Sequence, residues 1–279
     1  MIIRFWGSRG SIPVSGKEYI KYGGDTTCVE LRTKNDDIII LDAGSGIRRL
    51  GIQLLKEQRF HYYQIFTHSH WDHILGFPFF KPIYFKKTLI EFYSCPSTQV
   101  SIRKMLRKTM SFPHFPVRFE DIVASFRYHQ INGGKLKLAG LDVTTIPLSH
   151  PNRGFGYKFV ENGKSFVFLT DNELTYCHRG GLKFEDYVRF CKGVDLLVHD
   201  AEYTDLEYQY TRTWGHSVYT DALKLALQAG VKQFGLFHHN QERTCDAVDG
   251  MVRRCRKIIR DQKSALKCFA VATGTTVKL

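Results

Sequence analysis

The chain has 279 residues, 43% of them hydrophobic and 14% aromatic, so it can bury a sizeable core in one large α/β domain or two small ones. No apolar run approaches the roughly 20 residues that span a bilayer, and the first residues contain too few apolar side chains for a signal peptide. We therefore expect no membrane segment. The formal net charge of +13 favours anionic ligands, although it does not distinguish RNA or DNA from a small phosphate.

The cysteines bear on the cellular compartment. Seven cysteines, an odd number, are scattered along the chain, and no Cys-x-x-Cys pair occurs. This usage argues against a disulfide framework and against a thiolate zinc site. We therefore expect the protein to work in the reducing cytoplasm.

Short strands and glycine-containing turns alternate in the first part of the chain, and helices alternate with strands further on. Asn162-Gly163, between two apolar runs, predicts a hairpin of 156–160 with 165–169. The other predicted strands are 1–7, 28–31, 37–41, 62–66, 89–93, several within 122–148, 194–198, 233–237, and a last pair formed by 268–271 and 275–279. The predicted helices are 47–58, 99–110, 184–192, 218–229 and 246–261. Both halves repeat this plan, which predicts one α/β domain over 1–279: an αββα sandwich of two mixed β-sheets flanked by helices.

A basic aromatic segment at about 78–116 follows the fourth predicted strand. Its lysines and arginines alternate with aromatic side chains, a pattern that can stack bases and hold phosphates. The same pattern also suits an amphipathic cover that packs on the core with its charged face in water. The sequence leaves both interpretations open, and we treat the segment as an insertion in the domain.

A group of metal-ligand residues directly follows the predicted strand 62–66. Three histidines and an aspartate occur within six positions: His68, His70, Asp72 and His73. Neutral imidazole is the commonest metal ligand in proteins, and a carboxylate adds a hard oxygen that suits a second cation. The spacing therefore predicts a metal-binding turn at the end of a buried strand.

Polar residues of the same kind occur at the ends of other predicted strands. Strand ends open onto one edge of a sheet, where the loops can converge. Five strand ends carry histidine or aspartate: His68 with His70, His150, Asp171, His199 with Asp200, and His238 with His239. We expect several of these side chains to complete the metal site.

These motifs resemble the metallo-β-lactamase superfamily, and in particular its phosphodiesterase branch, which includes the tRNA 3′-processing endonuclease RNase Z and cyclic-nucleotide phosphodiesterases. The resemblance implies two divalent metal ions and a hydroxide shared between them. The implied ligands of the first metal are His68, His70 and His150, those of the second are Asp72, His73 and His238, and Asp171 bridges the two. His239 is the reserve candidate for the position of His238. Ligation by nitrogen and oxygen alone suits zinc and also manganese or iron.

A second match concerns the catalytic residues. Residues 197–202 resemble the RNase Z stretch His-Glu-Ala-Thr, with Asp200 in place of the glutamate, and Gly215-His216-Ser217 resembles the His-Ser-Thr loop of that branch. Carried over, Asp200 orients His216, which acts as general acid and protonates the leaving alkoxide. Asp72 joins these two residues in the catalytic set through the metal that it ligates. Asp42, after another strand, resembles a position that orients ligands.

The implied activity is metal-dependent hydrolysis of a phosphodiester in a small, cyclic nucleotide, with the shared hydroxide as nucleophile. The alternative is an RNase Z-like RNA 3′-processing endonuclease. RNase Z carries a long arm after the bridging aspartate, whereas here only 172–194 separate Asp171 from the next strand. The charge of +13 keeps RNA as a candidate partner. A metal-binding protein without turnover, or a hydrolase of thioesters, lactones or lactams on the same fold, would fit less of the pattern.

Members of the branch often pair, with a loop of the neighbour covering the site. The resemblance therefore implies a homodimer, and the segment 78–116 is the candidate cover.

Overall fold

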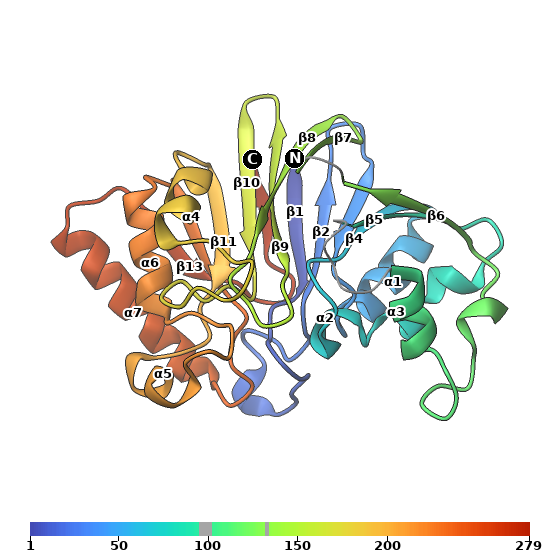
Figure 1. Ribbon diagram of the computed structural model, residues 1–279, viewed down its shortest axis with the longest axis horizontal. Coiled ribbons are helices and arrows are strands. Elements are labelled where there is room, and N and C mark those ends of the chain that lie inside the picture. Colours follow the sequence, from blue (N-terminus) through green and yellow to red (C-terminus); the bar gives the residue numbers. More distant parts are fainter. Residues whose placement is uncertain (95–101, 132–133) are drawn as a thin grey trace.

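Two β-sheets pack face to face in the computed structural model, which describes residues 1–94, 102–131 and 134–279 (Figure 1). Helices cover the outer face of each sheet, so the described residues form the predicted αββα sandwich. The α-helices are α1 (Ile47–Lys56), α2 (Trp71–Ile74), α3 (Ile102–Thr109), α4 (Phe184–Cys191), α5 (Asp205–Thr211), α6 (Tyr219–Gln228) and α7 (Cys245–Asp261). Four short 3₁₀ helices are η1 (Lys17–Tyr19), η2 (Phe77–Phe79), η3 (Lys81–Tyr84) and η4 (Phe119–Asp121) among the described residues.

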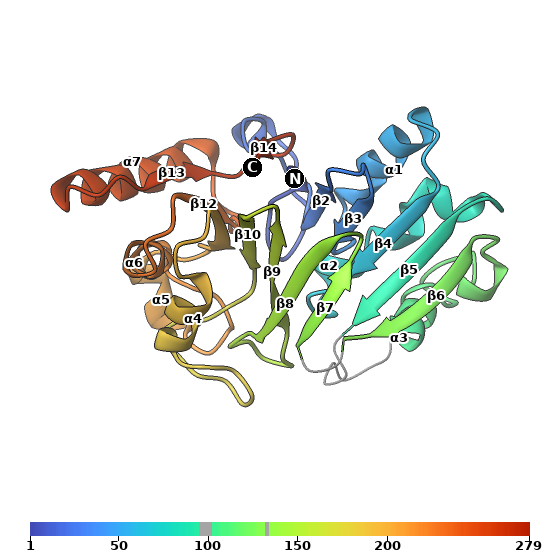
Figure 2. The same ribbon diagram turned by 90° about the horizontal axis from the view of Figure 1, so that it is seen from above.

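The first sheet is built mainly from the amino-terminal half of the chain. Its strand order is β14-β1-β2-β3-β4-β5-β6, with parallel pairing from β3 to β6 and antiparallel pairing elsewhere. The strands are β1 (Ile2–Gly7), β2 (Cys28–Arg32), β3 (Ile38–Leu41), β4 (His61–Ile65), β5 (Leu89–Ser94), β6 (Ser125–Gln130) and β14 (Thr276–Lys278). Helices α1 and α3 lie on its outer side (Figure 2).

The second sheet is built from the remaining strands in the order β13-β12-β11-β10-β9-β8-β7. Here β10 to β13 pair in parallel, and β7 to β10 pair antiparallel. The strands are β7 (Lys135–Leu138), β8 (Leu141–Pro147), β9 (Phe155–Glu161), β10 (Lys164–Leu169), β11 (Leu196–Asp200), β12 (Gln233–Phe237) and β13 (Lys267–Ala270). Both sheets are therefore mixed, as the sequence predicts.

Strand β10 shows how the sequence fills the layers. Successive side chains of a strand point to opposite faces of its sheet. Phe166 and Phe168 accordingly pack between the two sheets, whereas Val167 and Leu169 pack under the helices. All four side chains are fully buried, so an apolar run without alternation marks a strand that is covered on both faces.

The predicted hairpin is confirmed. Strands β9 and β10 pair antiparallel, and Glu161 lies opposite Lys164. The two connecting residues, Asn162 and Gly163, have φ angles of 49° and 74°. Positive φ at both positions is the requirement of a type I′ turn, which asparagine and glycine meet at low cost.

One prediction about the second half of the chain is wrong, and one helix there was missed. The last two strands do not pair with each other, because β13 adds to β12 in the second sheet and β14 adds to β1 in the first. Helix α5 was not predicted. Its start is marked by a reciprocal capping box, since the Thr204 side chain accepts from the N–H of Glu207 and the Glu207 carboxylate accepts from the N–H of Thr204. The Thr-x-x-Glu spacing was therefore a readable signal.

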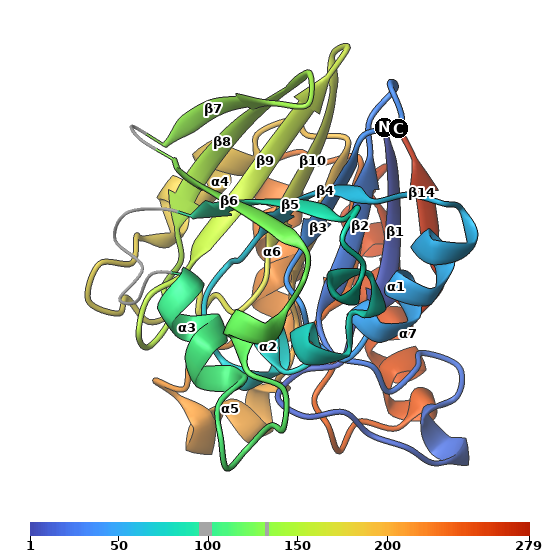
Figure 3. The same cartoon turned by 90° about the vertical axis from the view of Figure 1, so that its right-hand side faces the viewer.

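The segment 78–116 is more than an added cover. Strand β5 lies inside the first sheet between β4 and β6, and η3 packs against α1 (Figure 3). Phe80, Ile83 and Phe92 are fully buried in the core beneath α1 and α3. Phe79 and Phe112 are exposed, at 52% and 87%. The amphipathic interpretation thus describes much of the segment. Of the predicted helix 99–110, residues 99–101 lie outside the described residues.

Every helix in the described part of the chain is too short or too polar to serve as a membrane span.

Candidate active site

The predicted ligands meet at one edge of the two sheets, at the end where α2 lies in Figure 1. The chain leaves β4 at Ile65, turns through the loop that carries His68 and His70, and enters α2, which carries Asp72 and His73. The remaining predicted ligands come from the second sheet, within three residues of the ends of β8, β10 and β12: His150, Asp171 and His238. The site thus joins the carboxyl ends of strands from both sheets, as in other folds where loops at strand ends carry the function.

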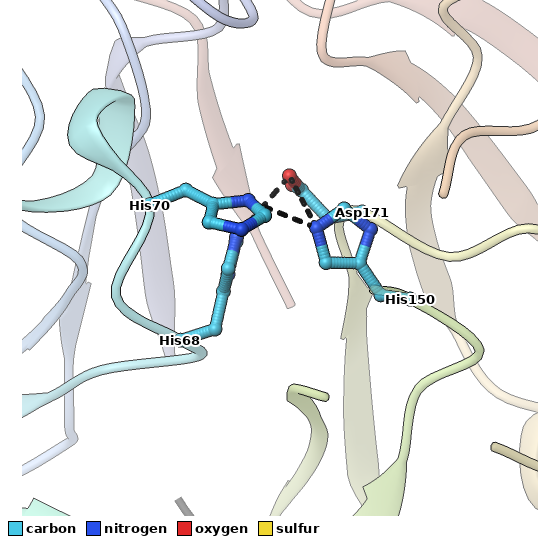
Figure 4. Close-up of side chains that lie close together, drawn as sticks. All are labelled: His68, His70, His150 and Asp171. Atoms are coloured by element: carbon cyan, nitrogen blue, oxygen red, sulfur yellow. Dashed lines mark hydrogen bonds and ion pairs between the residues drawn. The ribbon is translucent and has the colours of Figure 1, made fainter. Parts of the chain in front are cut away.

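The first cluster contains His68, His70, His150 and Asp171 (Figure 4). One ligand atom of each residue lies within 4.8 Å of those of the others. Nε2 of His150 is 3.0 Å from Nδ1 of His70, and Nε2 of His68 is 3.4 Å from Oδ2 of Asp171. Three imidazoles and one carboxylate converging on one point form a metal-binding geometry.

The second cluster contains Asp72, His73, Asp171 and His238. Nε2 of His73 lies 3.2 Å from Oδ2 of Asp72 and 3.2 Å from Oδ1 of Asp171. Nε2 of His238 lies 3.1 Å and 3.4 Å from the same two oxygen atoms. Asp171 therefore faces the first cluster with one oxygen and the second cluster with the other, which is the arrangement expected of a bridging carboxylate.

The residues present fit a pair of cations. Nε2 of His68 and Nε2 of His73 are buried and make no hydrogen bond in the described part of the chain. A buried ring nitrogen that lacks a hydrogen bond costs free energy, and here both nitrogens face carboxylate oxygens at 3.2–3.4 Å, which points to an ion between them. The two clusters define a candidate dinuclear metal site.

Burial favours the neutral form of the three histidines in the first cluster. It lowers the pKa of His68 and His70, and it lowers that of His150 to about 3. A neutral imidazole has a free lone pair, which is the form that binds a metal.

The second cluster has a different electrostatic environment. Burial alone would lower the pKa of His73 and His238, but the neighbouring carboxylates outweigh it, Asp171 foremost, and raise the pKa of both rings. The buried carboxylates therefore favour positive charge at this point of the site, whether it is supplied by a proton or by a cation.

Outer partners hold the ligand rings at Nδ1. His73 donates to Oδ2 of Asp42 over 2.8 Å, and His238 donates to Oε2 of Glu202 over 2.8 Å. His150 donates to the carbonyl oxygen of Gly215 over 2.9 Å. Such contacts fix the tautomer that presents Nε2 to a metal. The contact of Asp42 agrees with its predicted orienting role, whereas Glu202 was missed because the sequence gives no sign that it faces His238.

Three residues of this centre have left-handed backbone conformations. The φ angles of Asp42, Asp171 and His238 are 59°, 52° and 57°. Asp42 and His238 directly follow a strand and Asp171 lies two residues after one, so the left-handed backbone turns each side chain out of the strand and into the centre.

The predicted pair of His216 and Asp200 lies beside the second cluster. Nδ1 of His216 donates to Oδ2 of Asp200 over 2.6 Å, and the ring of His216 stacks on that of His238 with centroids 4.6 Å apart. Burial favours a neutral ring, but the carboxylates of Glu202 and Asp200 outweigh it and raise the pKa of His216 to about 9. His216 can therefore hold a proton near neutral pH.

Two histidines of the strand-end pattern lie away from the centre. His239, the reserve candidate, is buried and places Nε2 2.8 Å from the carbonyl oxygen of Val271. His199 is buried beside the side chain of Asn172. His199 and Asp200 are neighbours on β11 and point to opposite faces, so Asp200 alone of this pair reaches the site. Of the pair that follows β12, His238 alone reaches the site.

A cavity of about 350 Å³ opens next to His216. It is lined by Ser11, Glu202, Tyr203, Glu207, Thr211, Trp214, His216, Asn240, Gln241 and Glu242. Trp214 is 62% exposed, which leaves much of its indole free. The cavity was not predicted, because α5 and the loop after β12 come together only in the folded chain.

The two-sheet sandwich with its cluster of histidines and aspartates at the strand ends is that of a metal-dependent hydrolase. The family model described as "Beta-lactamase superfamily domain" matches residues 19–239, well over half of the chain, and the protein belongs to this superfamily.

One sequence relative is a protein named Ribonuclease Z from Exiguobacterium sibiricum. It is 26% identical over 208 residues, which cover 62% of this chain and 69% of the relative. The similarity therefore extends across most of both proteins.

Solved structures share the fold at low sequence identity. A diphosphatase of the PhnP family superposes with a TM-score of 0.69 at 17% identity and covers 100% of this chain and 97% of its own. The short form of human tRNase Z, ELAC1, superposes with a TM-score of 0.66 at 20% identity. The match covers 100% of this chain and 99% of the tRNase Z chain. The whole sandwich is thus common to these proteins.

Proposed function

We propose that the protein is a dinuclear metal-dependent phosphodiesterase that releases an alcohol from phosphorus. The observation that carries this proposal is the His216–Asp200 pair, because its proton donor stacks directly on His238 of the second cluster. An expelled ribose oxygen is a poor leaving group, and a positioned imidazolium can protonate it as it departs. Hydrolysis of a lactam or a thioester has less need of a proton donor at this position.

In this proposal His68, His70 and His150 hold one metal ion, Asp72, His73 and His238 hold the other, and Asp171 serves both. Zinc is the proposed ion, since the ligands are nitrogen and oxygen atoms, a set that manganese or iron would also accept. When bound, two such ions activate a water molecule as nucleophile and neutralise charge on the phosphoryl group.

The protein residues direct the proton. The Asp200 carboxylate accepts from Nδ1 of His216, so the other ring nitrogen, Nε2, is free to face the substrate. Backbone N–H groups of Glu202 and Ser217 donate to Oδ1 of Asp200 and hold the carboxylate in this orientation. Proton transfer from Nε2 to the departing oxygen accompanies cleavage of its bond to phosphorus.

We propose a small, cyclic nucleotide as the substrate. The cavity beside His216 has a volume of about 350 Å³, and no lysine or arginine is among the described residues that line it, whereas three glutamates are. This lining suits the uncharged nucleoside part of a single cyclic nucleotide better than a strand with further phosphates. The only helix in the described chain between Asp171 and β11 is α4, which leaves no room for a long RNA-binding arm.

An RNase Z-like RNA 3′-processing endonuclease is the second candidate. It is favoured by the curated relative that bears this name and by the formal net charge of +13. Phosphate contacts by basic residues dominate affinity for RNA, so this charge would support RNA binding.

One experiment separates the candidates. The purified protein is loaded with Zn²⁺ or Mn²⁺ and given 3′,5′- and 2′,3′-cyclic nucleotides and, separately, a 3′-extended tRNA precursor, with His216→Ala as the matched variant. Turnover of cyclic nucleotides that the variant loses supports the first candidate, and cleavage of the tRNA alone supports the second. Activity on neither, with two metals bound, would refute both.

We further propose that the enzyme acts as a homodimer in the cytoplasm. The exposed aromatic side chains of Phe79 and Phe112 in the segment 78–116 support a contact with a second copy. Because β5 is part of the sheet, the test replaces both phenylalanines with serine and measures mass in solution. An unchanged dimer would refute this contact, and a monomeric wild-type protein would refute the dimer itself.

A further inference from the structure

Glu173 is a buried carboxylate to which the sequence assigns no role. It lies two residues after Asp171 and is 1% exposed. Burying a carboxylate costs free energy unless the ionised group accepts several hydrogen bonds or the group is protonated. The hydrogen-bond partners of Glu173 therefore indicate its role.

Four donors surround Glu173. Oε1 accepts from the hydroxyl of Tyr208 over 2.5 Å and from the backbone N–H of Thr213 over 2.8 Å. Oε2 accepts from the backbone N–H of Gly215 over 2.8 Å and from Nε2 of His178 over 2.7 Å. Both oxygen atoms thus hold the loop that leads into His216.

Both backbone polar groups of Gly215 are hydrogen-bonded. Its N–H donates to Glu173, and its carbonyl oxygen accepts from Nδ1 of His150. The φ angle of Gly215 is +96°, and a Cβ atom there would lie 2.1 Å from Nδ1 of His150, so no larger residue fits. The residue that follows Gly215 is His216.

We propose that Glu173 is the positioning residue for the general acid: its carboxylate fixes the 213–215 backbone and thereby places Nε2 of His216 at the leaving oxygen. The inference rests on the proposed function, since it assumes that His216 donates a proton. Glu173 is not a member of the ligand clusters found among the described residues, and it contacts the loop through the N–H groups of Thr213 and Gly215.

The substitution Glu173→Gln tests this role because it nearly preserves shape. Glutamine offers one acceptor oxygen and one NH₂ group. Whichever way the amide is turned, the NH₂ group opposes two donors that now bind the carboxylate. The loop must shift, or buried donors lose their partner.

The closing experiment compares two leaving groups. Bis(4-nitrophenyl) phosphate releases a nitrophenolate that departs without a proton, whereas the nucleotide that the wild type hydrolyses releases an alkoxide that needs one. We expect Glu173→Gln to lower kcat on the nucleotide about a hundredfold, which is within the rate contribution that general acid catalysis usually makes. On the nitrophenyl ester, kcat should fall less than about threefold. His216→Ala should show the same contrast, and the double variant should lose no more than His216→Ala.

Tyr208→Phe is the matched control. It removes one donor from Glu173 and leaves both loop N–H bonds in place, so both substrates should be hydrolysed within about threefold of wild type. Metal content, measured by mass spectrometry, should remain two ions per chain in all of these variants. Equal loss on both esters in Glu173→Gln, or no loss on either, would overturn the proposal.

Hydrogen–deuterium exchange gives a result that does not depend on turnover. The peptide spanning 212–218 should exchange at least about tenfold faster in Glu173→Gln than in the wild type or in Tyr208→Phe, because two of its amides lose a charged acceptor. Unchanged exchange would overturn the inference even if the wild type hydrolysed no phosphodiester, an outcome that would refute the proposed function separately. If Glu173→Gln does not fold, Glu173→Asp carries the same test, since it keeps the charge but is too short to reach all four donors.

Discussion

At the scale of single residues, the centre is shaped by what each imidazole ring donates to on its far side. His73 donates to Asp42, His238 to Glu202 and His150 to a backbone carbonyl, so each ring presents Nε2 to the centre. These partners keep the proton on Nδ1 of each ring before a metal ion binds. Their substitution should therefore change metal affinity more than folding.

Asp42→Asn should weaken one metal ion selectively. Asp42 accepts from Nδ1 of His73 and from the N–H and hydroxyl of Thr67, and asparagine can no longer accept from all three. We expect the dissociation constant of the second metal to rise about 10- to 100-fold, with the first metal affected less. Titration with Zn²⁺ against a competing chelator measures both constants. Equal weakening of the two ions would contradict this selectivity.

His238 and His239 provide a matched pair. His238→Ala should leave about one metal ion per chain, since it removes a ligand from the second cluster. His239→Ala should retain two, because His239 contacts Val271 rather than the clusters. Metal content by mass spectrometry decides between them. Loss of metal from His239→Ala in a folded protein would show that the ligand has been misassigned.

At the scale of elements, the sequence predicted what depends on short-range patterns. The run of apolar residues before each strand-end motif located the strands, and Asn162-Gly163 located a hairpin, because both signals are local. The separation of β13 from β14 depends on which distant edge each strand meets, which no local pattern encodes. The same limit applies to Glu202 and Glu173, whose partners come from other segments of the chain.

Asp195, which directly precedes β11, should stabilise the second sheet in a pH-dependent way. Burial alone would raise its pKa, but the ammonium group of Lys232 and the N–H and hydroxyl of Ser165 outweigh it and lower the pKa. A folded-state pKa below the unfolded value means that the stabilisation is present above pH 4 and declines as the pH falls through the folded value. Asp195→Asn should lower the free energy of unfolding by about 1–2 kcal/mol at pH 7.

Urea denaturation at pH 7 and near pH 3 measures this difference. The gap between Asp195→Asn and the wild type should shrink at the lower pH, since the wild-type carboxylate begins to take up a proton there. A gap of constant size would mean that the charge of Asp195 has no part in the stabilisation.

At the scale of the whole molecule, the proposed metal ligands come from both sheets. His68, His70, Asp72 and His73 follow a strand of the first sheet, whereas His150, Asp171 and His238 follow strands of the second. Metal ions bound at this edge would therefore cross-link the two halves of the sandwich. Anything that binds the folded state alone stabilises it in proportion to the logarithm of its concentration.

Removal of metal should accordingly lower the melting temperature. At a free metal concentration a hundred times the dissociation constant, each site contributes about 2.7 kcal/mol. Differential scanning calorimetry of chelated protein, before and after Zn²⁺ is returned, should show a reversible gain, and His238→Ala should show a smaller one. A melting temperature independent of metal would argue that the clusters bind no ion in the folded protein.

The left-handed backbone at Asp42, Asp171 and His238 predicts which residues would replace them if the protein were selected for folding and not for activity. Aspartate and histidine adopt that conformation more readily than most side chains, but glycine adopts it at no steric cost. A library selected for folding alone should therefore accumulate glycine or asparagine at these three positions, and the selected proteins should be both more heat-resistant and inactive. Sequencing such a library would show whether the present residues are kept by selection for activity against the preference of the fold.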